Sequence, residues 1–332
     1  MDIHRTVLRL GAAAIVGALL FRLAGTQSLP GKFLDWINNP QTAAFLIYLE
    51  TGRDVRFLAS SQVFSPEFAP ESSDPLRIDS PVETLSFSGE DAEAVSVYYA
   101  GNQRPDLGSL ISAPLDWDLT VPEPTVLILH THATESYTKN GEDYRESSAW
   151  RTLDENYNML SIGDALGRLL AKKGITAVHD RTLHDYPSYN GSYNQARKSI
   201  AAYLEAYPTV RLVLDLHRDA ADTETGQLRT LANTESGQIA QLMLVMGTDE
   251  AGLTHPDWEE NLALALKLHA QLEQQCPGIM RPLILRTQRF NQDMSPGALL
   301  VEVGAAGNTH EEALGAVEQL AEAIAALARG SQ

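Results

Sequence analysis

The segment "TVLILHTHATESY", residues 125–137, changes character halfway along its length. Its first half is an apolar run from Val126 to Leu129, as expected for a buried β-strand. Two histidines, His130 and His132, and a carboxylate, Glu135, follow directly. The two imidazoles and the carboxylate are therefore expected to lie where this strand ends in its sheet. The type of sheet then determines which other strand ends lie beside them.

Strand-like and helix-like segments alternate from residue 125 to the end of the chain. Strands are predicted at residues 125–130, 175–180, 210–219, 282–288 and 297–304, with a strand pair around a turn at 233–237. Helices are predicted at residues 155–174, 188–208, 256–278 and 310–330. This alternation predicts one α/β domain, with a single mainly parallel sheet flanked by helices. In such sheets, functional groups gather at the carboxyl ends of the strands.

Three predicted strands end in chemically useful residues. They end in "HTHATE", "DLHRD" and "VEVGAAGN", which contribute His130, His132, Glu135, Asp215, His217, Arg218, Asp219 and Glu302. Imidazole nitrogens and carboxylate oxygens are ligands of Zn²⁺, which activates water when one position stays open. A single histidine after a strand is usually an ordinary loop residue, but "HTH" together with a third histidine at an equivalent strand end favours a metal site.

Glu302 lies within the otherwise apolar strand "GALLVEVG". A buried carboxylate without a partner costs several kcal/mol or becomes neutral. We therefore expect Glu302 to face a metal-activated water and to act as its general base. The alternative is a structural salt bridge between Glu302 and Arg218 or Arg197.

The N-terminal residues predict a membrane anchor. Residues 7–24 are long enough to cross a bilayer if Arg9 and Arg22 reach to its two surfaces. Positive charge before the span predicts a single-pass protein of the cell membrane, with the rest of the chain extracytoplasmic. A cleaved signal peptide is the alternative. The predicted organisation is a tail and anchor (1–28), membrane-near helices and a Ser-, Pro- and acid-rich linker (29–124), and a catalytic domain (125–330).

Composition excludes several classes of function. A net charge of −18 disfavours nucleic-acid binding, which needs a basic face. One cysteine, Cys276, excludes an intrachain disulfide and a cysteine-based zinc cluster. The sequence has no Gly-rich phosphate loop and no GxSxG motif, which argues against a phosphate-ester or nucleotide hydrolase.

Several long strings resemble the stage II sporulation protein P family. They are "HTHATESY", "DLHRDA", "HDYPSYNGSYNQAR" and "RFNQDMSPGALLVEVGAAGNT", and "AFLIYLETGR" matches more loosely. The resemblance implies a membrane-anchored peptidoglycan hydrolase, similar in fold to zinc amidases. Its implied activities are those of an N-acetylmuramoyl-L-alanine amidase and an endopeptidase in sporulation and engulfment, with stage II sporulation proteins D and M as partners. A catalytically inactive wall-binding module on the same fold is the alternative.

The wider amidase pattern implies a role for individual residues. It places His132, Asp154 and His217 as metal ligands and Glu302 as a catalytic residue. The chain departs from that pattern because its third ligand is Asp rather than Glu and because "HTH" replaces a glycine-bracketed histidine. His130 or Glu135 therefore remains open as the ligand, and Asp154 also suits a helix N-cap. If His130 is not a ligand, we expect it to be a catalytic residue together with Glu302. The residues expected to bind substrate or to support the site are Glu135, Arg197, Arg218, Asp219 and Asn308.

Overall fold

The computed structural model describes residues 95–138, 150–221, 227–235 and 237–330, together with the backbone of two short strands before them. Residues Gln62–Gln332 group into one unit, and the fold below is that of this unit. The predicted anchor and membrane-near helices lie outside the described residues. Within the described ranges, no helix is both long enough and apolar enough to cross a membrane.

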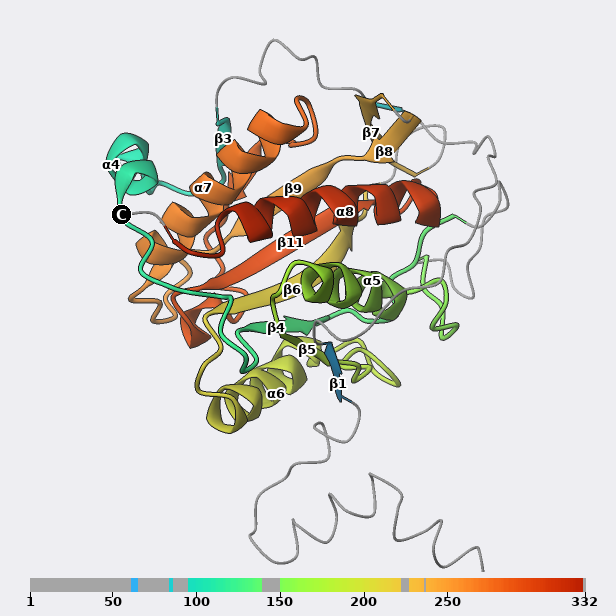
Figure 1. Cartoon of the computed structure of the whole chain (residues 1–332), viewed down its shortest axis with the longest axis horizontal. Helices are drawn as coiled ribbons and strands as arrows, with labels where there is room; N and C mark the ends of the chain where they lie inside the picture. The colour runs from blue at the N-terminus through green and yellow to red at the C-terminus, as the bar shows by residue number, and fades with distance from the viewer. Residues whose placement is uncertain are drawn as a thin grey trace, which may run out of the picture. The chain divides into compact units, whose positions relative to one another are not determined.

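An eight-stranded sheet forms the centre of the unit, in the order β1–β5–β4–β6–β11–β9–β10–β3 (Figure 1). In that order, the strands are Ser61–Phe64, Ala177–Asp180, Val126–Leu129, Leu212–Asp219, Ala298–Ala305, Leu242–Met246, Leu283–Leu285 and Val97–Tyr99. Pairing is parallel among β5, β4, β6 and β11, and again among β9, β10 and β3. The predicted mainly parallel sheet flanked by helices is confirmed.

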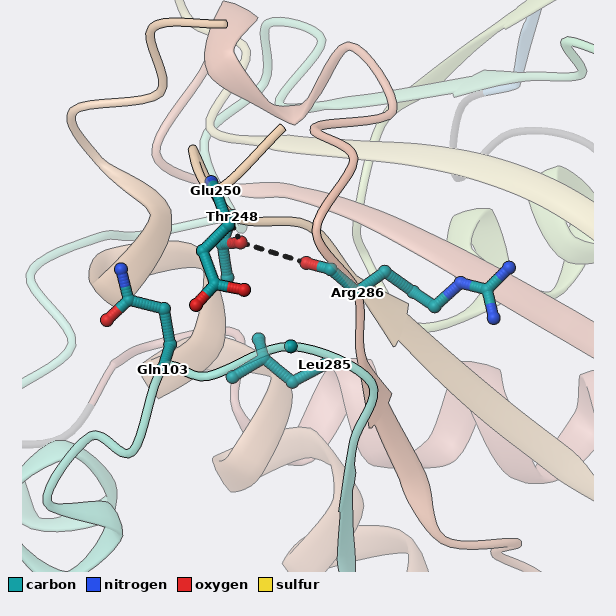
Figure 2. Close-up of a pocket in the computed structure, with 6 residues that line it drawn as sticks. Gln103, Thr248, Glu250, Leu285 and Arg286 are labelled. Carbon is teal, nitrogen blue, oxygen red and sulfur yellow. Dashed lines mark hydrogen bonds between the residues drawn. The ribbon is translucent and has the colours of Figure 1, made fainter. Parts of the chain in front are cut away.

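The pairing of β11 with β9 is antiparallel and reverses the strand direction within the sheet. As a result, β4, β6 and β11 end at one edge, whereas β9, β10 and β3 end at the opposite edge. A small pocket lies at that second edge, lined by Gly101, Gln103, Thr248, Glu250, Leu285 and Arg286 (Figure 2). Its lining contains one carboxylate and no histidine. The histidine-bearing strand ends therefore lie at the other edge of the sheet.

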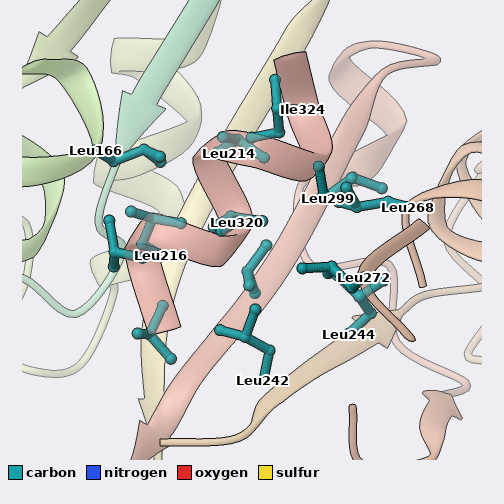
Figure 3. Close-up of a cluster of buried hydrophobic side chains, with 14 of the residues drawn as sticks. Leu166, Leu214, Leu216, Leu242, Leu244, Leu268, Leu272, Leu299, Leu320 and Ile324 are labelled. Atoms are coloured by element: carbon teal, nitrogen blue, oxygen red, sulfur yellow. The ribbon is translucent and has the colours of Figure 1, made fainter. Parts of the chain in front are cut away.

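One face of the sheet is covered by α5 (Met159–Lys172), α7 (Trp258–Gln275) and α8 (His310–Ala326), and α4 (Leu107–Ser112) packs against α7. Leucine side chains from these helices and from the strands beneath them form the main core (Figure 3). On the opposite face, Met243, Val245 and Leu300 cluster with Phe290. The ring of Phe290 packs 6.0 Å from that of Tyr193, on α6 (Ser192–Ala206).

Strand alternation decides which face each polar group occupies. On β6, Leu214 and Leu216 belong to the main core, so Asp215 and His217 project from the opposite face. On β11, Val301 and Val303 belong to the main core, so Glu302 projects from the same face as His217. The candidate site therefore lies on the face that carries α6.

One predicted strand is divided into two strands in the structure. The strand expected from residue 237 to 248 divides at the buried Gln241, whose backbone accepts from Gly304 at 2.9 Å. Before this point β8 (Gly237–Ala240) pairs with β7 (Arg229–Thr234) in a small sheet with β2 (Thr84–Leu85), and after it β9 joins the large sheet. The short strand β3, in "SVYYAG", pairs in parallel with β10. His269 is buried in α7.

Candidate active site

The three histidine- and carboxylate-bearing strand ends meet at one edge of the sheet. Parallel pairing of β6 with β11 sets His217 directly beside Glu302. The ring of His132, which follows β4, lies 5.2 Å from the ring of His217 and nearly perpendicular to it. His132, His217 and Glu302 thus come from separate strands to a common location.

His217 lies between two carboxylates. Its Nδ1 is 3.5 Å from Oε2 of Glu135, and its Nε2 is 2.9 Å from Oδ1 of Asp215, although the latter angles are not those of a hydrogen bond. Asp215 is itself oriented by Thr131, whose backbone N and Oγ1 donate to its two oxygens at 2.7 and 2.6 Å. Burial opposes protonation of His217, but the charges of Asp215 and Glu135 prevail and raise its pKa.

Glu135 is held as a carboxylate by arginines. The backbone N of Arg218 donates to Oε2 at 3.2 Å, and its Nη1 lies 3.6 Å from Oε1. Nη2 of Arg151 lies 3.4 Å from the same Oε1. Burial alone would raise the pKa of Glu135, but the positive charges of Arg218 and His217 outweigh it and lower that pKa.

His132 is a neutral imidazole with an available nitrogen. Burial lowers the pKa of His132 to about 4. Its Nδ1 is buried and has no hydrogen-bond partner among the described residues. The ring stacks on Tyr189 at 4.5 Å between centroids and meets the edge of Tyr193 at 5.6 Å.

Glu302 is half-buried on β11. Its Oε2 is shielded from solvent and has no hydrogen-bond partner in the described part of the chain. Burial raises the pKa of Glu302 against the opposing charge of His217. The structure shows neither predicted salt bridge: Arg218 binds Glu135, and both terminal nitrogens of Arg197 donate to Asp293, at 2.8 and 2.7 Å.

The donor atoms around His217 fit zinc in part. Among the described residues, no three His, Cys, Asp or Glu side chains are already arranged to hold a metal ion. Two donors that are each about 2.0–2.1 Å from a tetrahedral zinc lie about 3.4 Å apart. The separation of 3.5 Å between Glu135 Oε2 and His217 Nδ1 matches this spacing, and His132, with its unpaired Nδ1, lies next to that pair.

His130 lies on the other face of the sheet, away from this group. Its Nδ1 is 3.0 Å from the carbonyl oxygen of Leu216, and its Nε2 is 2.8 Å from Nε2 of His179. His179 in turn contacts Asp164 at 2.8 Å. The pair packs closely under α5, where a Cβ on Gly163 would lie 2.6 Å from His130 Nε2. Both ring nitrogens of His130 are therefore engaged outside the candidate site.

Asp154 forms hydrogen bonds with Asn156. Its Oδ1 accepts from the backbone and side-chain nitrogens of Asn156, at 3.1 and 2.9 Å. The N-cap of α5 is Asn158, not Asp154. The two carboxylates that the structure places beside His217 are those of Glu135 and Asp215.

Three further predicted residues have structural partners. Besides the Arg197–Asp293 pair, Asp219 binds Arg281 at 2.7 Å. Asn308 is fully buried and makes hydrogen bonds to Thr230, Ala305 and Glu312, so it fixes the loop that follows β11.

The structure also places Arg151, Tyr189 and Tyr193 at the site, and of these three residues sequence reasoning gave no role to Arg151. Tyr193 meets the edge of His132, and burial together with the charges of Asp215 and Glu302 raises the pKa of its hydroxyl. The string "HDYPSYNGSY" was a visible signal for the tyrosines. Arg151 had no such signal, because its partners are distant in sequence.

The chain is similar to one known protein family and, more remotely, to several solved structures. The family model for stage II sporulation protein P matches residues 77–325. Stage II sporulation protein P of Bacillus subtilis strain 168 is 27% identical over 206 residues, covering 58% of this chain and 48% of that protein. The chain thus matches about half the length of that curated relative.

Solved structures are more remote. N-acetylmuramoyl-L-alanine amidases of Nostoc punctiforme and Clostridium difficile 630 are 14% and 17% identical, with TM-scores of 0.34 and 0.35. Each match covers 61% of this chain and 94% of the amidase. A succinylglutamate desuccinylase of Chromobacterium violaceum is 13% identical, with a TM-score of 0.33, over 62% of this chain and 63% of that one. Such low scores carry no conclusion about the site.

Proposed function

The chain belongs to the stage II sporulation protein P family, and on that premise we propose that it is a zinc-dependent peptidoglycan hydrolase. The proposed reaction is cleavage of the amide between N-acetylmuramic acid and L-alanine. The observation that carries the proposal is the pairing of Glu135 and His217 at the spacing of zinc ligands, beside Glu302, whose Oε2 has no hydrogen-bond partner among the described residues. Peptide cross-links are a second proposed substrate.

In this proposal His132, Glu135 and His217 hold the metal. Zinc bound there would supply a Lewis acid that acidifies water and polarises the amide carbonyl. Asp215 lies at the second ring nitrogen of His217, the place where a carboxylate commonly orients a ligating histidine. Arg218 keeps Glu135 charged and in place.

Glu302 is the proposed general base. Its carboxylate takes the proton of the attacking water and returns it to the leaving nitrogen, which becomes the free amine of L-alanine. The raised pKa of Glu302 favours this role, because the group must hold a proton between the two steps. Arg218 binds Glu135 and Arg197 binds Asp293, so among the described residues neither of the two arginines expected to pair with Glu302 does so.

The cellular setting is also a proposal. Residues 1–28 are proposed to anchor the chain in the cell membrane, with residues 29–124 as the membrane-near region and linker. The catalytic domain, 125–330, would then act outside the cytoplasm during sporulation, together with stage II sporulation proteins D and M. β3 and α4, which precede residue 125, pack on this domain.

Removal of metal is expected to abolish hydrolysis. Purified full-length chain in detergent should stop solubilising peptidoglycan in excess chelator, and added Zn²⁺ should restore the rate, because water is no longer activated without the metal. Turbidity of a cell-wall suspension measures this directly. Hydrolysis that continues in chelator would contradict the metalloenzyme, whereas zinc binding without any hydrolysis would favour the inactive wall-binding module.

A further inference from the structure

The loop between β5 and α6 is tied to the segment that carries His132. Asp185 in this loop accepts from Oγ1 of Thr134 at 2.6 Å and from its backbone N at 3.3 Å. Nη1 of Arg151 binds the same carboxylate at 2.5 Å. Gly191, with φ of 92°, then lets the chain turn into α6. The loop is thus fixed at its base, two residues from His132.

Tyr189, near the tip of this loop, lies flat on His132. The two ring centroids are 4.5 Å apart and the ring planes differ by 16°. The guanidinium carbon of Arg151 lies 4.5 Å from the same tyrosine ring. Arg151 therefore contacts the base of the loop through Asp185, its tip through Tyr189, and the neighbouring Glu135.

The two histidines of the site are oriented in different ways. A metal-binding histidine usually offers its second ring nitrogen to a carboxylate or a carbonyl, and this contact sets the plane of the ring. The Nε2 of His217 faces a carboxylate, with Oδ1 of Asp215 at 2.9 Å, although the angles are not those of a hydrogen bond. Among the described residues no hydrogen bond to a ring nitrogen of His132 is found, and its Nδ1 is buried and unpaired. Stacking contacts the face of the imidazole and leaves both nitrogens available in the ring plane.

We propose that Tyr189 is a positioning residue that sets the ring plane of His132 for metal binding, and that the Arg151–Asp185 ion pair holds Tyr189 in place. In this proposal Tyr189 orients the ring of His132, and Asp215 orients the ring of His217. This inference rests on the proposed function, in which His132 is a zinc ligand. It assigns no contact with the substrate to Tyr189.

Zinc affinity of the full-length chain in detergent tests the proposal, measured by competition with a chromophoric chelator. Tyr189→Leu removes the aromatic face and should weaken zinc binding by about 10-fold or more, the effect of losing a partner that orients a ligand. Tyr189→Phe keeps the ring and should bind zinc like the wild type. The matched control is Tyr186→Leu, because Tyr186 lies in the same loop and is 54% exposed, against 53% for Tyr189.

A second readout needs neither metal nor activity. In the metal-free chain the ring current of Tyr189 should displace the ring proton signals of His132, which His132→Ala identifies in a histidine-labelled NMR spectrum. Tyr189→Leu should abolish the displacement, and Tyr186→Leu should retain it. A wild-type His132 signal without any displacement would overturn the inference even if Tyr189→Leu fails to fold.

The remaining outcomes separate this inference from the proposed function. If the wild type binds zinc and Tyr189→Leu binds it as tightly as Tyr186→Leu, Tyr189 does not position His132, and the function stands. A higher KM for peptidoglycan with unchanged zinc affinity would likewise overturn the inference, since Tyr189 would then be a substrate contact. A wild-type chain that binds no zinc would remove the proposed function and this inference with it.

Discussion

Replacing Glu302 by glutamine is expected to lower the rate of peptidoglycan hydrolysis by about 10²–10⁴-fold. Glutamine keeps the size of the side chain and one acceptor oxygen, but it cannot take the proton of the attacking water. Because Oε2 of Glu302 has no partner among the described residues, the substitution breaks no hydrogen bond at that atom. The variant should therefore fold, bind zinc and bind cell wall as the wild type does.

Glu273→Gln is the matched control for this experiment. Glu273 is buried, and burial raises its pKa as it raises that of Glu302, but the oxygens of Glu273 accept from the backbone of Gly278 and Met280 at 2.9 and 2.6 Å. Its loss should change stability rather than the rate per folded molecule. Full activity of Glu302→Gln would refute the general-base role, and loss of zinc from this variant would make Glu302 a ligand instead.

His132→Ala and His217→Ala are expected to lose zinc. Each removes a proposed ligand, so the loss of affinity should exceed the roughly 10–100-fold that removal of a supporting partner costs. Zinc content after gel filtration, measured by atomic absorption, reports the effect. Wild-type stoichiometry in either variant would contradict the proposed ligand set.

The third ligand is decided by comparing two carboxylates. Asp154→Ala should retain zinc, because Asp154 is engaged with Asn156 rather than with the histidines. Glu135→Gln should weaken zinc binding, since glutamine offers a neutral oxygen in place of a carboxylate. Full truncation of Glu135 is less informative, because removing one partner of the buried Glu135–Arg218 ion pair costs about 3–5 kcal/mol. Loss of zinc from Asp154→Ala with retention in Glu135→Gln would restore Asp154 as the ligand.

The sheet was largely predictable because its central strands are continuous apolar runs. β4 is apolar throughout and β6 begins with three apolar residues, which is typical of strands covered on both faces. The division of the strand at Gln241 was not predictable, because it depends on a hydrogen bond with Gly304, a residue far along the chain.

The location of the candidate site was predictable from strand ends, but individual roles were not. The strand ends at Leu129, so the spacing of "HTH" does not keep both histidines on one face. His130 continues the alternation of Val126 and Ile128 toward α5, and His132 lies beyond the turn on the other side. Tyr189 and Arg151 reach the site through an ion pair between loops, and no local pattern in the sequence predicts that contact.

The most direct test of the whole account is the chemical identity of the products released from purified peptidoglycan by the full-length chain with zinc. Mass spectrometry should find stem peptides with a free N-terminal L-alanine, together with glycan strands that carry unsubstituted lactyl groups. Fragments cut between sugars, or no soluble product from a zinc-loaded and folded protein, would contradict the assignment as an amidase.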